Sequence, residues 1–548
     1  MLPINRAAAF AAAILVFLPL ATTASSSPVE SLEAASEEFW SQAKEAGFVL
    51  RSAPSAAPAQ FRQLKQEPDY TCSETKPCSL GCCGPLDDEG NGVCGAGPDF
   101  CGTGCTSQCD WKSECDPGWG LQWSNATTCP LNVCCSTFGF CGTTSTFCGG
   151  QLAPQPQCSG RSSDARTIGY WEGWNAQRPC GRMPPQEIPL GYYTHLFYSF
   201  ALIDPNTFHI APMDEETASH YQEVANLKDR QDGLEVWIAI GGWAMNDPGP
   251  YRTTFSDMAS SEANQDAFFE SVVTFLYQNN FDGVDIDWEY PVADDRGGTP
   301  EDFENFVTML RRFRERLNRT GRKFGLSITL PASYWYLRGF DIVNLEPFVD
   351  FFNMMTYDIH GVWDQNVTAI GSFAFAHTNM TEIDQALALL WRNHINPERV
   401  NLGLGFYGRS FTMKDPNCMA AGCEFSDGAA GGRCTGTAGV LSAAEIVEII
   451  DNGATVTFDE AAGVKIVTYN QDQWVSWDDA QTLKIKMDFA NERCLGGTFV
   501  WAVDLDDGTM IEALGSNLGR EKKRVWNTTY YEADGMAWGA VLPEEEEE

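Results

Sequence analysis

The sequence is short of basic residues, of histidine and of long apolar runs. Its 36 Lys and Arg face 74 Asp and Glu, giving a formal net charge of −38. This balance argues against nucleic acid or an anionic membrane as a partner, and favours a neutral or cationic one. The 6 histidines show no metal-ligand spacing, so neither a metal nor another cofactor is expected. No apolar stretch, the N-terminal one included, reaches the ~20 residues of a membrane span.

What the chain has is length, a core and unevenly placed cysteines. At about 150 residues per domain, 548 residues correspond to three or four domains, or one large domain with smaller ones. The composition, 43% hydrophobic and 12% aromatic, is that of a folded chain. Fifteen of the 20 cysteines lie between Cys72 and Cys158, which indicates either a disulfide scaffold or a metal cluster.

The N-terminal residues decide between these two alternatives. Arg6 precedes an apolar run over 7–20 and small residues over 21–24, the pattern of a secretory signal peptide. We therefore expect a soluble, extracellular monomer whose cysteines form disulfides, and leave open its association with a cell wall. Sequons typical of a secreted chain stand at Asn125, Asn318, Asn366, Asn379 and Asn527.

Changes in composition divide the chain into segments. The predicted segments are a signal peptide over 1–24, a propeptide or linker over 25–70, cysteine-rich units over 71–110 and 111–160, an α/β region over 165–518 and an acidic tail over 519–548. A helix is possible from Ser31 to Ala46, but no core pattern follows it.

Strand-like runs alternate with helical stretches through the α/β region. The alternation predicts a (β/α)8 TIM barrel, with a doubly wound open sheet as the alternative. The predicted strands are Thr167–Tyr170, Tyr193–Ala201, Leu234–Ile240, Gly283–Asp287, Phe324–Leu330, Phe351–Met355, Val400–Phe406 and Gly497–Trp501. The long segment before the last strand predicts an α+β insertion after strand seven, at about 407–475, and then a helix over 478–490.

The fourth predicted strand carries an acidic motif, FDGVDIDWEYP, over 281–291. In a strand, Asp285, Asp287 and Glu289 project to one face, which in a barrel is the interior that opens at the C-terminal end. Three adjacent carboxyls cannot all ionise cheaply, so at least one should stay protonated, as a general acid must. Asp282 has the opposite parity and a structural role. The interleaved apolar residues argue against an exposed acidic edge, and acids at every second residue of a stiff strand suit a calcium site poorly.

This motif resembles the signature of glycoside hydrolase family 18, the chitinases, and the resemblance extends over most of residues 165–505. Further segments similar to family motifs are Trp237–Trp243, Met355–Asp358 and Tyr407–Arg409, together with Tyr170 on strand one and Trp501 on the last strand. The family often has serine where this chain has Ala239, so a hydroxyl that supports the buried aspartate would be missing.

The resemblance implies a retaining hydrolysis of chitin in which the substrate assists. Glu289 would protonate the glycosidic oxygen while the substrate's own acetamido oxygen attacks the anomeric carbon. Asp287 would orient the acetamide and share a proton with Asp285, and Tyr357 would hydrogen-bond the acetamide. The substrate-binding residues expected are Asp358, Trp501, Tyr170, Trp243, Trp363, Tyr407 and Arg409, with Trp335 as a weaker aromatic candidate.

The cysteine-rich window contains two units, each with a central cysteine pair, and reads as a tandem repeat. The spacing resembles hevein-like chitin-binding modules. The sugar site implied in the second unit consists of Ser136, Phe138, Phe140 and Phe147. The first unit keeps only Phe100 of the aromatic set and is as consistent with a disulfide-stapled spacer as with binding.

The hevein resemblance also implies a disulfide pattern. The implied pairs are Cys72–Cys83, Cys78–Cys94, Cys82–Cys101, Cys105–Cys109, Cys115–Cys135, Cys129–Cys141 and Cys134–Cys148. Cys158 is left over, and our hypothesis is that it pairs with Cys180 and ties the module to the barrel.

The interpretation that best joins these features is a secreted chitinase with a chitin-binding arm, acting on chitin and its oligosaccharides. Endo- and exo-action both remain open. A rival is a chitin-binding lectin on an inactive enzyme fold. Another is the chitin-binding subunit of a secreted toxin.

Overall fold

The computed structural model of the chain describes residues 28–45, 70–367, 370–523, 528–533 and 536–541. The predicted signal peptide, the sequon at Asn527 and the acidic end over 544–548 lie outside these residues. The described chain divides into two compact units, one of 28–45, 70–127 and 137–140, and the other of 128–136 and everything from Cys141 onward. Among the described helices, none combines the length and apolar character needed to cross a bilayer.

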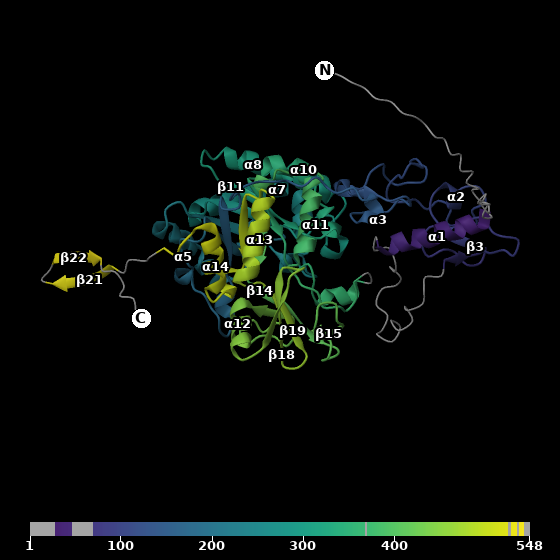
Figure 1. Ribbon diagram of the computed structural model, residues 1–548. Helices are drawn as coiled ribbons and strands as arrows, with labels where there is room; N and C mark the ends of the chain where they lie inside the picture. The colour runs from purple at the N-terminus through teal and green to yellow at the C-terminus, as the bar shows by residue number, and fades with distance from the viewer. Residues whose placement is uncertain (1–27, 46–69, 368–369, 524–527, 534–535, 542–548) are drawn as a thin grey trace, which may run out of the picture. The chain divides into compact units, whose positions relative to one another are not determined.

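The second unit contains a closed barrel of eight parallel strands (Figure 1). The strands, in their order around the barrel, are β6 (Arg166–Glu172), β20 (Gly497–Trp501), β13 (Val400–Gly405), β12 (Phe351–Met355), β11 (Gly325–Pro331), β10 (Gly283–Asp287), β9 (Glu235–Gly241) and β7 (His195–Ile203). β6 pairs with both β20 and β7, which closes the sheet. The prediction of a TIM barrel is therefore confirmed, and the open-sheet alternative is wrong.

Helices cover the outside of this barrel (Figure 1). The longer ones are α7 (Glu262–Asn279), α8 (Asp302–Asn318), α11 (Met380–Trp391), α13 (Ala480–Glu492) and α14 (Thr509–Leu518). Shorter ones are α4 (Glu215–Ser219), α5 (Tyr221–Ala225), α6 (Thr254–Ala259), α9 (Tyr334–Leu337) and α10 (Ile342–Leu345). The strands are apolar runs because the helices bury their outer faces while neighbouring strands fill the interior.

One tryptophan shows how the inside of the barrel is filled. The ring of Trp237 on β9 lies over Gly283 and Gly325, the first residues of β10 and β11. A Cβ at Gly283 would come within 2.4 Å of that ring, and one at Gly325 within 1.8 Å. Two neighbouring strands therefore begin with glycine where the indole needs the space.

An α+β lobe is inserted between β13 and α13, as predicted (Figure 1). Its elements are β14 (Tyr407–Met413), β15 (Phe425–Gly428), β16 (Val440–Ser442), α12 (Ala443–Asp451), β17 (Thr455–Asp459), β18 (Val464–Tyr469) and β19 (Gln473–Trp477). All the pairings in its sheet are antiparallel. Phe411 and Trp474 are fully buried in its own core, which gives the lobe a fixed shape beside the barrel.

The first unit combines the first cysteine-rich repeat with an N-terminal helix. Its elements are α1 (Pro28–Glu45), β1 (Thr71–Cys72), β2 (Cys82–Cys83), β3 (Gly92–Gly95) and α2 (Pro98–Cys101). The side chains of Phe39 and Trp40 on α1 are buried, and the Ser36 hydroxyl donates to the Cys94 carbonyl at 2.6 Å. Residues 25–70 carry no core pattern in the sequence, so this packing was not predicted.

The second repeat has its own short elements, β4 (Cys134–Cys135), β5 (Cys141–Gly142) and α3 (Ser145–Cys148). In both repeats a four-residue helix ends in Phe-Cys, and its phenylalanine lies on a glycine. A Cβ at Gly95 would come within 2.5 Å of Phe100, and one at Gly142 within 2.6 Å of Phe147. The shared arrangement supports the interpretation of the window as a tandem repeat.

Six of the disulfides implied by the hevein resemblance are present in the structure. They are Cys72–Cys83, Cys78–Cys94, Cys82–Cys101, Cys105–Cys109, Cys129–Cys141 and Cys134–Cys148. Cys115 and Cys135 are also disulfide-bonded, and their pairing with each other stays a prediction.

The hypothesis that Cys158 pairs with Cys180 is wrong. Cys158 is bonded to Cys494, Cys180 to Cys434, and a further disulfide joins Cys418 to Cys423. The reason is topological: Cys158 precedes β6 and Cys180 follows it, so the strand separates them to opposite ends of the barrel. Cys494 stands just before β20, at the end of the barrel that Cys158 reaches.

The C-terminal segment, predicted to be a solvated acidic tail, contains two strands. β21 (Thr528–Ala533) and β22 (Met536–Val541) pair antiparallel.

Candidate active site

The three carboxyls of the acidic motif form a row along β10 and the residues that follow it. Asp285 is fully buried, Asp287 is 3% exposed and Glu289 is 8% exposed. Exposure therefore rises toward the C-terminal end of the strand, where a barrel presents its reactive groups. Asp282 lies apart from this row: its carboxylate accepts from Lys228 and Arg322, in agreement with the predicted structural role.

Three side chains, from β6, β11 and β12, hold the innermost carboxyl. Asp285 accepts hydrogen bonds from the Tyr170 hydroxyl at 2.6 Å, the Ser327 hydroxyl at 2.6 Å and the Asn353 amide at 3.3 Å. Ala239 is the residue of β9 in register with Asp285, and Ser327 is its partner on β11. Ser327 on β11 thus supplies the hydroxyl that residue 239 on β9 lacks.

Burial sets the protonation of the row. It raises the pKa of Asp285 to about 6, although its three hydrogen bonds act in the other direction. Burial, followed by the Glu289 and Asp285 carboxyls, raises the pKa of Asp287 well above its usual range, against a 2.5 Å hydrogen bond from Thr329. Burial also raises the pKa of Glu289 to about 7. The outermost carboxyl can therefore carry a proton near neutral pH, as a general acid requires.

A second charged group follows β12. Asp358 accepts two hydrogen bonds from Arg409, Nε to Oδ1 at 2.7 Å and Nη2 to Oδ2 at 2.5 Å, and one from the Tyr407 hydroxyl at 2.5 Å. Burial alone would raise the pKa of Asp358, but Arg409 and a hydrogen bond with His377 hold it well below its usual range. Asp358 is thus a fixed anion, in contrast to the carboxyls on β10, whose pKa values are all raised.

Tyr357 stands between these two groups. Burial raises the pKa of its hydroxyl well above the usual range, and the Asp287, Asp358 and Glu289 carboxyls add to the shift. The hydroxyl therefore keeps its proton and can donate it to an acceptor in the site. Its ring fits closely against the backbone, since a Cβ at Gly403 would come within 2.9 Å of it.

The predicted aromatic platforms differ in exposure. Trp243 is 50% exposed and Trp363 is 37% exposed. A guanidinium lies over each: Arg296 at 3.6 Å from the Trp243 centroid, and Arg409 at 4.8 Å from that of Trp363. Trp335 carries Arg338 in the same way, at 3.7 Å. Cation–π contacts of this kind fix the orientation of exposed rings.

A cavity of about 200 Å³ adjoins this group of residues. Trp501 lines it together with Asp358, Tyr407 and Arg409, and the Trp501 ring stacks on Phe200 at 5.5 Å. The remaining lining comes from the end of β6 and the loop after it, from the lobe, and from Leu505 after β20. The cavity thus has an aromatic wall and a charged pair, the combination that suits a sugar ring.

Tyr170 lies beneath the site and not on its surface. It is 1% exposed, and its hydroxyl is engaged with Asp285 and Asn353. These hydrogen bonds position Asp285, and a part for Tyr170 in substrate binding stays a prediction.

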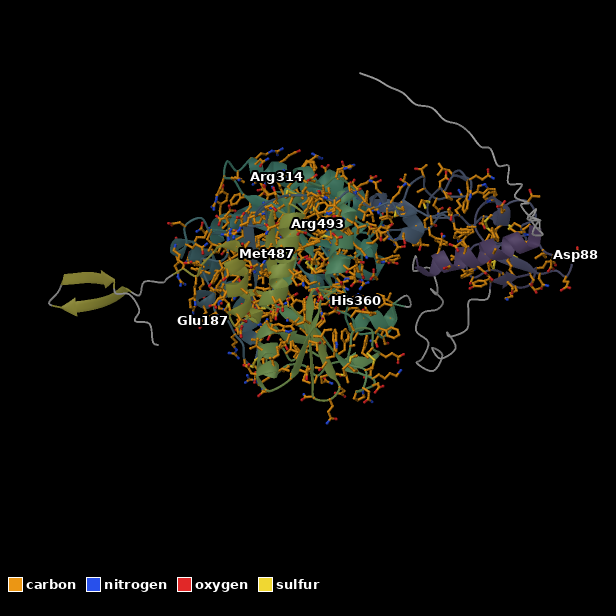
Figure 2. The ribbon with its side chains drawn as sticks, viewed as in Figure 1. Asp88, Glu187, Arg314, His360, Met487 and Arg493 are labelled. Carbon is orange, nitrogen blue, oxygen red and sulfur yellow. A yellow bond between two sulfur atoms is a disulfide. The ribbon has the colours of Figure 1, made fainter. Side chains whose placement is uncertain are left out.

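Histidine takes a structural part near the site. His360, labelled in Figure 2, bonds to Asp364 at 2.7 Å and to Glu382 at 2.9 Å. Although burial opposes it, these two carboxylates raise the pKa of His360 to about 9, so the imidazole is a cation in an ion-pair network. Two sets of three buried cysteine sulfurs lie at metal-binding distances, but all six cysteines are engaged in disulfides.

The predicted sugar site of the second repeat is largely buried. Ser136, Phe140 and Phe147 have exposures of 1%, 0% and 6%, and Phe138 is half-buried. Phe39 of α1 contacts the rings of Phe140 and Phe138, with centroids 5.1 and 6.2 Å apart. Phe39 thus contacts Phe138 and Phe140, two of the rings that are predicted to bind the sugar.

Several residues that support the carboxyl row were not predicted from the sequence. They are Ser327 and Thr329 on β11, Asn353 on β12 and Asn401 on β13, which donates to Asn353 at 2.8 Å. The signal that could have found them is alternation: polar residues at every second position of otherwise apolar strands face the barrel interior.

Comparisons with known families support two separate assignments. Residues 166–506 match the model of the glycosyl hydrolases family 18, and residues 120–158 match the chitin recognition protein family. The first match covers the barrel and its lobe, and the second covers the greater part of the second cysteine-rich repeat.

The chain is also similar to curated proteins and solved structures. It is 32% identical over 426 residues to a probable chitinase, LysM18, of Penicillium expansum, with 71% of this chain and 29% of the relative covered. It is 31% identical over 414 residues to the killer toxin subunits alpha/beta of Kluyveromyces lactis, with 72% and 34% covered. The chain thus spans about a third of these relatives. The catalytic domain 2 of the Ostrinia furnacalis Group II chitinase superposes with a TM-score of 0.59 at 26% identity, covering 66% of this chain and 98% of that domain.

Proposed function

Because the chain belongs to family 18 of the glycosyl hydrolases, we propose that it is a secreted chitinase that hydrolyses β-1,4-linked N-acetylglucosamine polymers and oligomers. The observation that carries the proposal is the buried row of carboxyls on β10, which ends in Glu289 with a pKa raised to about 7. The disulfide-rich second repeat, which matches the chitin recognition family, would hold the enzyme on its polymer. Secretion is supported by the many disulfides, which persist in oxidising compartments.

In the proposed reaction, the protonated Glu289 carboxyl donates its proton to the glycosidic oxygen. The acetamido oxygen of the sugar being cleaved forms a bond to the anomeric carbon as the bond to the leaving oxygen breaks, so the intermediate is an oxazolinium ion. Glu289, now ionised, takes a proton from a water molecule that attacks the same carbon and reopens the ring. The two inversions leave the β configuration retained.

The other residues of the site prepare the acetamide for this step. Asp287 would hold its N–H and stabilise the positive charge that develops, sharing a proton with Asp285. The Tyr357 hydroxyl would donate to the acetamide oxygen, and its raised pKa supports that role because the hydroxyl stays protonated. The Asp358–Arg409 pair would hold sugar hydroxyls, and Trp501 would lie against the ring face.

The test is hydrolysis of chitin oligomers by the wild-type protein and by Glu289→Gln, with Glu301→Gln, an exposed glutamate before α8, as the control. Loss of a general acid is expected to lower kcat by about 10²–10⁴-fold, whereas the control keeps its activity. No turnover by the wild type would remove the enzyme claim and leave a chitin-binding lectin. Equal turnover by the wild type and Glu289→Gln would remove the residue assignment.

A second candidate function comes from the similarity to the killer toxin subunits. In that case the barrel and the second repeat would form the chitin-binding part of a secreted toxin. This candidate predicts that the protein associates with another polypeptide in culture medium, whereas the enzyme proposal is satisfied by an active monomer.

A further inference from the structure

Two hollows lie on either side of a narrow ridge beside the candidate active site. The first is the cavity of about 200 Å³ that contains Asp358 and Trp501 in its lining. The second, of about 440 Å³, is lined by Cys180 and Cys434, by further residues of the loop after β6 and of the lobe, and by residues that follow β20, among them Asp504 and Asp506. Arg178 and Thr435 line both hollows, so these two side chains form the ridge between them.

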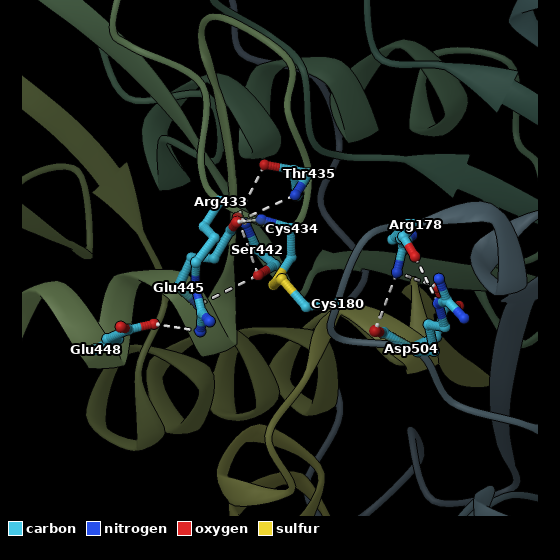
Figure 3. Close-up of a disulfide and its surroundings, with 10 residues drawn as sticks. Arg178, Cys180, Arg433, Cys434, Thr435, Ser442, Glu445, Glu448 and Asp504 are labelled. Carbon is cyan, nitrogen blue, oxygen red and sulfur yellow. Dashed lines mark hydrogen bonds and ion pairs between the residues drawn. A yellow bond between two sulfur atoms is a disulfide. The ribbon is translucent and has the colours of Figure 1, made fainter.

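The barrel side of the ridge is Arg178, in the loop after β6 (Figure 3). Its guanidinium pairs with Asp504 Oδ2 at 2.8 Å, donates to the Asp504 carbonyl at 3.3 Å and pairs with Glu172. The arginine side chain is 12% exposed. Because Glu172 ends β6 and Asp504 follows β20, two strand ends of the barrel hold this side chain in place.

The lobe side of the ridge is Thr435, held by a buried glutamate (Figure 3). The Thr435 hydroxyl donates to Glu445 at 2.9 Å and its N–H donates to the same carboxylate at 3.1 Å, as does the Cys434 N–H at 2.6 Å. Glu445 is 5% exposed and also closes the capping box of α12 with Ser442. The segment that carries Thr435 is thus anchored to the first turn of a helix.

A disulfide joins the two sides of the ridge. Cys180 lies two residues after Arg178, and Cys434 immediately precedes Thr435. Their bond links positions 254 residues apart, with a Cα–Cα distance of 4.8 Å. The loop after β6 and the lobe therefore cannot separate at this point without breaking a covalent bond.

The position of Glu289, the proposed general acid, indicates on which side of the cleaved bond the ridge lies. Glu289 protonates the leaving oxygen in the proposed reaction, so the leaving part of the chain lies on its side. Arg296 marks that side, since it donates to the Glu289 carbonyl at 3.0 Å and lies over Trp243. The first cavity is lined by Asp358 and Arg409 and does not include Glu289 or Trp243. It therefore holds the opposite, non-reducing part of the sugar chain.

We infer that the Cys180–Cys434 disulfide bars the groove on its non-reducing side, so that the enzyme acts close to the non-reducing ends of chitin chains. This inference rests on the proposed function. A cavity of about 200 Å³ is smaller than the roughly 300–1,000 Å³ that hold drug-sized ligands, so it accommodates one or two sugar rings and not a continuing polymer. Joined to the second hollow, it would form a longer groove.

The first test uses the wild-type protein and chitin hexamers labelled at the reducing end. The pieces released from the non-reducing end are expected to be short, mainly monomers and dimers, from the first minutes of the reaction. Major release of trimers or longer pieces from that end overturns the inference while leaving the chitinase proposal intact. Absence of any product contradicts the proposed function itself.

The second test compares Cys180→Ser/Cys434→Ser with Cys418→Ser/Cys423→Ser, which removes the other disulfide of the lobe. Removing the Cys180–Cys434 bond is expected to shift hexamer cleavage toward longer pieces from the non-reducing end. It should also raise the rate of hydrolysis of long soluble chains. The control should keep the wild-type product pattern. Unfolding is monitored by circular dichroism. A folded Cys180/Cys434 variant with the wild-type product pattern overturns the inference, and if that variant does not fold, the wild-type product pattern decides.

Discussion

The barrel buries a row of carboxyls that hydrogen bonds hold in place, whereas the cysteine-rich region buries aromatic side chains against one another. In the barrel, exposure rises from Asp285 to Glu289, and hydrogen bonds from β6, β11 and β12 hold the buried end of the row. In the cysteine-rich region, Phe140 is fully buried and in contact with Phe39. Buried polar side chains need a network of hydrogen bonds, whereas apolar side chains are stabilised by burial itself.

The two regions should therefore respond differently to substitutions and to pH. Hydrolysis depends on protonation and on a few hydrogen bonds in the barrel. Retention on chitin through the second repeat depends on the apolar area of its phenylalanine rings and on whether α1 covers those rings. Each of the following changes is expected to alter one property and spare the other.

The largest effect in this comparison is expected for Asp287→Asn, which replaces the carboxyl that would hold the acetamide N–H and share a proton with Asp285. Hydrolysis should fall by about 10²–10³-fold, as for loss of a preorganised contact to the transition state. Retention on chitin beads should not change. The measurement is kcat on soluble oligomers, with the exposed Asp266→Asn on α7 as the control. A fall of less than threefold would remove Asp287 from the mechanism.

The next effect is that of pH. Because burial raises the pKa of Glu289 to about 7, the acid is protonated below that value and ionised above it. As pH rises through 7, kcat/KM should begin to fall, approaching about tenfold for each further unit. Chitin retention should stay level, since Phe138 and Phe140 do not titrate. A rate that is flat across this range would contradict a Glu289 acid.

A smaller effect is expected for Ser327→Ala. The change removes a hydrogen bond that lowers the pKa of Asp285, so that pKa should rise further. A hydrogen bond to a charged group contributes about 1.5–3 kcal/mol, so kcat/KM should fall by about tenfold or more, with a shifted pH profile. Adding Ala239→Ser, on the strand at the other side of Asp285, should restore part of the loss. An unchanged pH profile would leave Ser327 a structural residue only.

The smallest effect is expected for Phe39→Ala, which uncovers Phe138 and Phe140. Retention on chitin should increase by a few-fold, up to about tenfold for 1.4 kcal/mol of binding energy. Hydrolysis of soluble oligomers should not change, because α1 lies in a separate unit from the barrel. The neighbouring exposed Glu37→Ala is the control. Reduced retention in a folded Phe39→Ala protein would show that Phe39 supports the sugar site.

Much of the barrel could be predicted because each strand is a local apolar pattern. β10, β12 and β20 begin and end at the predicted residues, and the acidic row on β10 followed from alternation alone. Its supporting residues could not be found that way, since Ser327 meets Asp285 through strand register. The Cys158 pairing failed for the same reason: proximity across a closed barrel depends on which strand ends meet.

The packing of α1 was beyond local patterns as well. Phe39 and Trp40 stand in a segment rich in alanine, serine and glutamate, without the apolar repeat of a core helix. Their burial depends on contacts with residues far along the chain, such as Trp111 and Phe140. A helix of this kind is recognised by its partners and not by its own sequence.

The most direct measurement is the anomeric form of the first product. Proton NMR of a chitin tetramer, recorded in the first minutes of hydrolysis before mutarotation, separates the two configurations of the new reducing end. The account predicts the β anomer, because the acetamido group attacks first and water then attacks the oxazolinium ion. An initial α anomer would contradict the substrate-assisted mechanism and the roles given to Asp287 and Glu289.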